Sequence, residues 1–153
     1  MTKENKILLI HDLMARIPYG VYVEHLPSGF NIKPSNIVIH PLYKENEIDD
    51  YICDIDVTGG NDWNKIENFK PYLFPLSSLT YEQKHEFFCR FIENEIDFID
   101  FQHYYFDVNR FERLFTSVSD VQGMIEWFHK NHIDYRNLIG KSLANDASKI
   151  KIY

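Results

Sequence analysis

Two prolines close together constrain the middle of this chain more than any other feature of its sequence. Lys70-Pro71 and Phe74-Pro75 lie in the segment FKPYLFPLSSLT, which carries bulky apolar residues between the prolines. A proline fixes its own φ and moves the preceding residue out of the helical region, so this segment is extended and stiff. We therefore predict a Pro-rich connector over residues 69–79. Three of its side chains are expected in the core: Tyr72, Leu73 and Leu76.

Alternating apolar and polar residues predict a strand-rich front ahead of the connector, over residues 1–68. The alternation is clearest in YICDIDV, where one face is apolar and the other carries Asp54 and Asp56. Short turns between successive strands favour an antiparallel meander. Strands are predicted at residues 21–26, 36–42, 51–57 and 63–69, after a first helix at residues 5–16.

Helix-start signals mark the part of the chain behind the connector, residues 80–145. Thr80 and Gln83 have the spacing of a capping box, in which each side chain accepts a hydrogen bond from a free N–H group at the helix start. Ser119 and Gln122 repeat this spacing. The second half of the chain is therefore predicted to be rich in helix.

The remaining segments behind the connector are less regular. Residues 97–115 fit a strand or a continuing helix equally well. A short last helix is predicted from Asp134, and the polar tail at residues 146–153 is predicted to fray.

A single α+β domain accounts for this order of elements. A chain of 153 residues, of which 44% are apolar and 16% aromatic, is long enough and apolar enough to bury one core. We predict a three- to four-stranded, mainly antiparallel sheet, with an N-terminal helix and two to three C-terminal helices packed on one of its faces.

The formal net charge of -7 disfavours binding to duplex nucleic acid, which needs clustered lysine and arginine to neutralise phosphates. Acidic residues concentrate at residues 45–56 and 93–100. They form either two solvated faces or a surface that imitates nucleic acid for a basic host protein.

The cysteines and the lengths of the apolar runs indicate the cellular compartment in which the protein is expected. Cys53 and Cys89 form no CxxC pair, and we expect both to be reduced and buried. The apolar runs are too short for a signal peptide or a membrane span. We therefore expect a cytoplasmic protein with no membrane partner.

Four short segments stand in an order that resembles a known protein family. They are ILLI followed by LMARIPYG, then FKPYLFPLSSLT, then WFHKNHIDYRNLI, and then KSLA. A family of small proteins encoded by phages and prophages of gut bacteria typically shows RLPYGV, KPYLRPxSSMT, FDYRGLI and GLALEA in this order. The resemblance covers most of the chain, and it implies an accessory protein of a mobile genetic element without implying a particular activity.

The chain departs from the family pattern at two positions. Phe74 stands where the family usually shows arginine, and Asn137 stands where it usually shows glycine. If the family arginine binds an anion, this chain has lost that site.

Two pairs of side chains have the spacing of metal ligands. His129 and His132 are three residues apart, and Asp54 and Asp56 point the same way from a predicted strand. Neither pair has the further ligands of a convincing site, so core or capping histidines and the wet face of a strand are the simpler interpretations. We predict no metal and no cofactor, and we keep Asp54 and Asp56 as candidate binding residues.

Tyr135 and Arg136 follow Asp134 at the start of the predicted last helix, where free N–H groups attract an anion. The simpler interpretation is that Asp134 caps the helix and pairs with Arg136. A candidate cationic and aromatic binding patch joins Tyr135 and Arg136 to three other residues: Lys70, Tyr72 and Arg16.

The sequence contains no P-loop, GxGxxG, HExxH or CxxC motif, and it favours a non-enzymatic binding protein. We expect an anti-CRISPR-like inhibitor of a host anti-phage defence component, which binds a host protein, such as a nucleic-acid-handling effector, through an acidic and aromatic surface. One alternative is a small-molecule binder that sequesters a signalling nucleotide through Arg136 and Lys70. A second is a small metal-dependent hydrolase that uses Asp54, Asp56 and a histidine.

Overall fold

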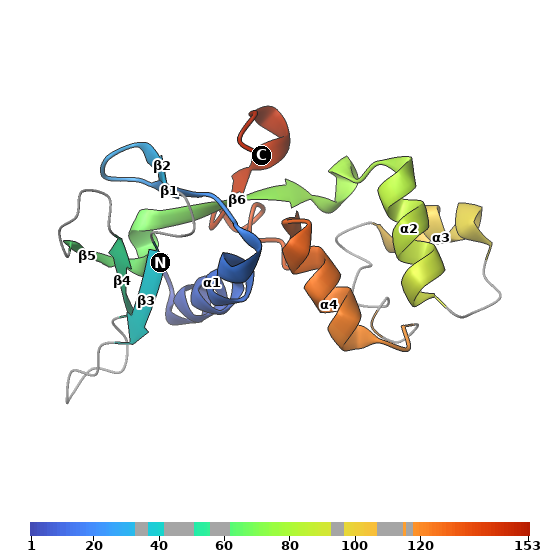
Figure 1. The fold of residues 1–153 in the computed structure, drawn as a ribbon, viewed down its shortest axis with the longest axis horizontal. Helices are drawn as coiled ribbons and strands as arrows, with labels where there is room; N and C mark the ends of the chain where they lie inside the picture. Colours follow the sequence, from blue (N-terminus) through green and yellow to red (C-terminus); the bar gives the residue numbers. More distant parts are fainter. Residues whose placement is uncertain (33–36, 42–50, 56–61, 93–96, 107–114, 116–117) are drawn as a thin grey trace.

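The segment that we predicted to be a connector is the central strand of the main sheet (Figure 1). Strand β6 (Phe69–Pro75) pairs with β1 (Val23–His25), β7 (Ile133–Asp134) and β8 (Asn145–Asp146), and β2 (Phe30–Ile32) pairs with β1. The result is a five-stranded mixed sheet, because β7 and β8 run parallel to β6. Our prediction of a three- to four-stranded, mainly antiparallel sheet is wrong for this sheet.

The two prolines fit into β6 because their missing N–H groups fall where no partner strand needs them. Tyr72 and Phe74 each donate the backbone N–H group to a carbonyl oxygen of a neighbouring segment, at 2.9 Å. Backbone groups alternate sides along a strand, so the nitrogens of Pro71 and Pro75 face the opposite edge. There β8 pairs only with Tyr72 and Leu73, between the prolines. Residues 69–75 are extended as predicted, whereas residues 76–78 form a short 3-10 helix. The three expected core residues are buried: Tyr72, Leu73 and Leu76.

The structure, a computed structural model, describes residues 1–32, 37–41, 51–55, 62–92, 97–106, 115 and 118–153. These residues form one α+β domain with an N-terminal helix and C-terminal helices, as predicted. The helices are α1 (Lys3–Arg16), α2 (Tyr81–Phe91), α3 (Phe98–Tyr105) and α4 (Val121–Lys130). A second sheet contains β3 (Ile37–Pro41), β4 (Tyr51–Ile55) and β5 (Asp62–Lys65), which pair in order and antiparallel and confirm the predicted meander.

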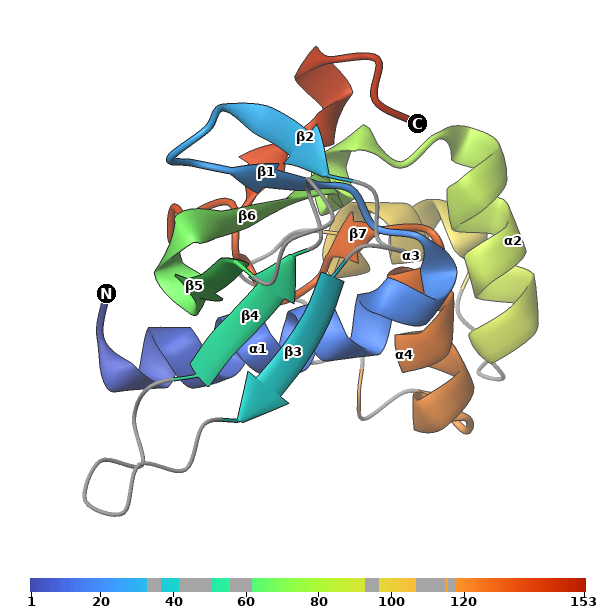
Figure 2. The ribbon, with the colours of Figure 1, turned by 60° about the vertical axis from the view of Figure 1, so that its left-hand side comes forward.

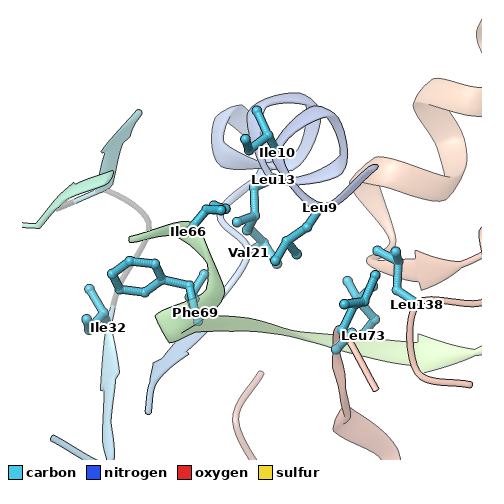
Figure 3. Packing of buried hydrophobic residues seen from close by; sticks show 12 residues of the cluster. Leu9, Ile10, Leu13, Val21, Ile32, Ile66, Phe69, Leu73 and Leu138 are labelled. Carbon is cyan, nitrogen blue, oxygen red and sulfur yellow. The ribbon is translucent and has the colours of Figure 1, made fainter. Parts of the chain in front are cut away.

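A first core lies between α1 and the main sheet (Figure 3). Thr2 begins α1 by accepting a hydrogen bond from the Asn5 N–H group at 3.3 Å, which satisfies one free donor of the first turn. Leu9 and Leu13 lie one turn apart on the buried face of the helix. They pack with Phe69 and Leu73 of β6, with Ile66 just before it, with Val21 before β1 and with Leu138 after β7.

A second core consists largely of aromatic rings and joins α2, α3 and α4 at the end of the molecule away from β3–β5 (Figures 1 and 2). Phe87 of α2 is fully buried at its centre. Its ring centroid lies 6.3 Å from that of Phe101, 5.2 Å from that of Trp127 and 5.2 Å from that of Phe128. Ring pairs at these distances add to the stabilisation from buried area alone. The open choice at residues 97–115 is settled in favour of helix for residues 98–105, and residues 107–114 lie outside the described part of the chain.

The predicted helix starts are correct for α2 and displaced by one residue for α4. Gln83 N–H donates to Thr80 Oγ1 at 3.2 Å, and Thr80 N–H donates to Gln83 Oε1 at 2.9 Å, which completes the capping box. At α4 the capping residue is Asp120 instead of Ser119, and its Oδ1 accepts the Gly123 N–H group at 2.8 Å.

The chain after α4 does not form the predicted last helix. Asp134 belongs to β7, and its carboxylate accepts the N–H groups of Leu138 and Ile139, both at 2.8 Å, which closes a turn. Three residues of this region other than glycine have a positive φ, which a right-handed helix does not allow: His132 (54°), Asn137 (57°) and Ser142 (60°).

The tail at residues 146–153 is ordered against the sheet, which differs from the predicted fraying. Ala147 is buried beside β6, after the short strand β8. The Tyr153 hydroxyl lies between two backbone groups of the sheet. It accepts the Tyr22 N–H group at 3.3 Å and donates to the Tyr72 carbonyl oxygen at 2.8 Å. A side chain thus completes the ladder where β1 and β6 begin to separate.

Replacing Tyr153 by phenylalanine should destabilise the protein by about 1–2 kcal/mol, because both backbone groups lose their hydrogen-bond partner. Urea unfolding measures this change. Tyr81→Phe is the matched control, since Tyr81 is 60% exposed and its replacement should change the free energy of unfolding by less than about 0.5 kcal/mol. Equal stability of the two variants would contradict this role of the hydroxyl.

Candidate functional site

A fully buried ion pair lies on α1. Arg16 Nε lies 2.6 Å from Asp12 Oδ2, and Arg16 Nη2 lies 3.2 Å from Asp12 Oδ1. Arg16 also donates to the carbonyl oxygens of Phe128, at 3.2 Å, and Ile133, at 2.8 Å. The guanidinium therefore ties α1 to α4 and β7. Our placement of Arg16 in a cationic surface patch is wrong, because this side chain is 0% exposed.

Arg136 lies at the outer edge of this buried pair. Its Nη1 lies 3.8 Å from Asp12 Oδ1, and its guanidinium carbon lies 5.1 Å from the centroid of the Tyr135 ring. The Asp134 carboxylate is engaged by backbone N–H groups, and burial raises its pKa above the ordinary value despite these bonds. The simpler interpretation is wrong in both parts, since Asp134 closes a turn and caps no helix, and Arg136 pairs with Asp12.

His129 and His132 are both buried, and they have different neighbours. His129 Nε2 lies 3.1 Å from the Tyr135 hydroxyl, whereas the His132 ring stacks on Tyr153 with centroids 4.5 Å apart. Desolvation, assisted by the Arg16 charge, lowers the pKa of each imidazole to about 4, so both rings are neutral at pH 7. The histidines are core residues, as the simpler interpretation expected.

The structure does not bring the predicted binding residues together. Lys70 lies near the start of β6, and Tyr72 is buried two residues further on. Asp134 is paired with Pro75, which lies about 16 Å from Lys70 along the strand at the usual rise per residue. Tyr135 and Arg136 follow Asp134 and are therefore remote from Lys70.

Of the predicted acidic pair and the two cysteines, the structure describes only the Cys89 side chain. The Asp54 side chain and all of Asp56 lie outside the described residues, as does the Cys53 side chain. Cys89 is exposed on α2, with Sγ 3.7 Å from His85 Nδ1, so its predicted burial is wrong. Among the described residues, no group of three or more His, Cys, Asp or Glu side chains is placed to hold a metal ion.

Exposed aromatic side chains gather where α2 and α3 begin. The ring centroids of Tyr81 and Phe98, the first residues of these helices, are 5.3 Å apart, and the His85 ring lies 5.0 Å from that of Phe98. Tyr81 is 60% exposed and Ile99 is 62% exposed. We call these four residues the Tyr81 surface. The Tyr81, His85 and Phe98 rings contact one another, with Phe98 half-buried, and Ile99 is the next residue of α3. Single exposed apolar residues are common, whereas a group of this kind marks a candidate contact site.

Three carboxylates border the Tyr81 surface. Glu82 and Asp100 lie in the first turns of α2 and α3, and Asp97 caps α3 by accepting the Ile99 N–H group at 2.8 Å. Carboxylates stabilise helix starts, which explains their position in the absence of a partner. All three are exposed, so they also give the surface an acidic border.

No known protein family, curated protein or solved structure matches this chain. The resemblance to phage and prophage proteins stays a prediction. Within the described part of the chain, no helix has the length and apolar character needed to cross a membrane.

Neither the buried ion pair nor the Tyr81 surface was predicted from the sequence. Asp12 and Arg16 are four residues apart on the same face of α1 as Leu9 and Leu13, and that spacing is a signal for a buried pair. The Tyr81 surface has no such signal, because its residues come from two helices whose packing the sequence does not reveal.

Proposed function

We propose that the protein is a non-enzymatic accessory protein of a phage-type element, which inhibits a host anti-phage defence component by binding to it. The Tyr81 surface carries this proposal. Its rings contact one another, and three exposed carboxylates lie beside them along the chain at the starts of α2 and α3. Aromatic residues at the centre and charged residues at the rim are typical of protein–protein interfaces.

The charge of the protein favours a basic partner. The net charge is -7, and Glu82, Asp97 and Asp100 lie at the border of the Tyr81 surface. Proteins that handle nucleic acid present lysine and arginine to phosphates, and such a basic surface complements an acidic one. The proposed partner is therefore a host effector that handles nucleic acid.

The buried polar groups have structural roles, which leaves the Tyr81 surface as the proposed site of function. Asp12 and Arg16 bond to each other and to the backbone, and Asp134 bonds to two N–H groups. These contacts use the groups to hold segments together. The side chains that remain available at the Tyr81 surface offer shape and charge to a partner.

Replacing both Tyr81 and Ile99 by serine should weaken binding to the host effector about 30-fold or more, the loss expected when an interface hot spot is removed. The measurement is the dissociation constant, by biolayer interferometry, for the effector that the wild-type protein recovers from host lysate. Phe30→Ser is the matched control, since Phe30 is 64% exposed on β2 and lies outside the Tyr81 surface.

Two further results decide the proposal. Charge reversal at Glu82 and Asp100 should lower the association rate, and added salt should reduce the difference from wild type. An effector that binds the Tyr81→Ser/Ile99→Ser variant and the wild type equally well would refute the proposed surface.

A further inference from the structure

A cavity of about 420 Å³ lies where the end of β6, the start of α2 and the turn after α4 meet. Residues from all three segments line it, including Phe74, Gln83, Lys130, Asn131, His132 and Tyr153. Its volume lies within the usual range for small-molecule sites. It contains none of the residues that we predicted to bind a nucleotide.

His132 is the most unusual residue of this cavity. It is 8% exposed, and its Nδ1 has no hydrogen-bond partner among the described residues. Its φ of 54° is in the left-handed region, where histidine, like asparagine and aspartate, is found more often than other residues with a side chain. An unsatisfied buried nitrogen costs stability, and such a group calls for a structural or functional explanation.

The remaining lining separates into an aromatic side and a polar side. The Tyr153 ring stacks on His132, and its centroid lies 5.5 Å from that of Phe74. Asn131 and Gln83 bring side-chain amides. Lys130 brings a positive charge, and no ion pair of Lys130 occurs within the described residues. A flat ring and an acidic group on one molecule would complement both sides.

We propose that this cavity binds a small aromatic molecule that carries one acidic group, with the chemistry of a nucleoside monophosphate. The base lies against the Tyr153 and Phe74 rings, and the phosphate lies at Lys130. Stacking on aromatic side chains and a charge-assisted hydrogen bond to phosphate are the usual sources of affinity for such molecules. The cavity shares the start of α2 with the Tyr81 surface, because Thr80 and Gln83 line it on either side of Tyr81, but nucleotide binding does not require the proposed function.

The test measures thermal stability and calorimetric binding of the full chain with AMP, GMP, CMP and UMP. A ligand that binds only the folded protein raises the melting temperature. We expect such a rise with at least one nucleotide at 1 mM, and none with inorganic phosphate or ribose 5-phosphate. Equal stabilisation by inorganic phosphate would show an anion site alone and would overturn the aromatic part of the proposal. No rise with any nucleotide would overturn it completely.

Two variants locate the site. Lys130→Gln should weaken nucleotide binding about tenfold or more, through loss of one charge-assisted hydrogen bond. His132→Asn removes the ring on which Tyr153 stacks and should weaken binding by loosening that aromatic wall, and asparagine tolerates the positive φ at this position. Lys65→Gln, an exposed lysine of β5, is the control and should leave the affinity unchanged. Because Lys130 is also exposed, its replacement tests the site even if His132→Asn unfolds the protein. Nucleotide binding that survives Lys130→Gln at full affinity would refute this placement.

Discussion

Replacing Asp12 by asparagine should destabilise the protein by about 3–5 kcal/mol, the usual cost of removing one partner of a buried ion pair. Arg16 would keep its charge in a site where both side chains are fully buried. Its hydrogen bonds to the carbonyl oxygens of Phe128 and Ile133 cannot replace a counter-charge. Because domains of this size are stable by only about 5–15 kcal/mol, urea or thermal unfolding should show the loss clearly.

Two comparisons show whether burial is the cause. Lys6 and Glu67 form an ion pair of 3.4 Å between α1 and the segment before β6, and both side chains are partly exposed. Glu67→Gln should therefore cost less than about 1 kcal/mol. The double variant Asp12→Leu/Arg16→Met removes both charges and should be more stable than Asp12→Asn, since no unpaired charge stays buried. An Asp12→Asn loss as small as that of Glu67→Gln would contradict the structural role of the pair.

Acidification from pH 7 to pH 4 should destabilise the protein by about 3 kcal/mol for each of its two buried histidines. Burial lowers the pKa of His129 and His132 from 6.5 to about 4 in the folded state, so the unfolded chain binds more protons between these values. Stability is therefore full above pH 6.5 and falls as the pH falls toward 4. Asp134 partly opposes this at the acidic end, because its raised pKa favours the folded state when the carboxyl becomes protonated.

Urea unfolding at pH 7.5, 6.5, 5.5 and 4.5 measures this dependence. His129→Gln and His132→Asn should each remove about half of the loss between pH 6.5 and 4.5. His11→Gln is the control, because His11 is exposed on α1. If all three variants kept the wild-type pH dependence, the buried imidazoles would not be its source.

Features of the fold that depend on residues close in the sequence could be predicted. Thr80 and Gln83 satisfy each other's backbone groups within one turn, so their spacing alone predicted the start of α2. The meander of β3, β4 and β5 follows from strand patterns that succeed one another along the chain. Leu9 and Leu13 share the buried face of α1 because helical periodicity places them there.

Features that depend on contacts between residues far apart in the sequence could not be predicted. A central strand with two prolines is uncommon, and β6 is possible only because β8 pairs with the two residues between the prolines. Tyr153 is far in sequence from Tyr22 and Tyr72, so nothing local predicts that its hydroxyl completes their ladder. Arg16 looked available for an anion because the sequence does not show that the ends of α4 and β7 cover it.

Hydrogen–deuterium exchange of the protein, free and bound to its host effector, tests the central claim most directly. We expect binding to slow exchange at the starts of α2 and α3, which carry Tyr81 and Ile99, and to leave β1 and β2 unchanged. Protection confined to the β1–β2 hairpin, or to residues 130–133 at the end of α4, would contradict the assignment of the Tyr81 surface as the site of contact.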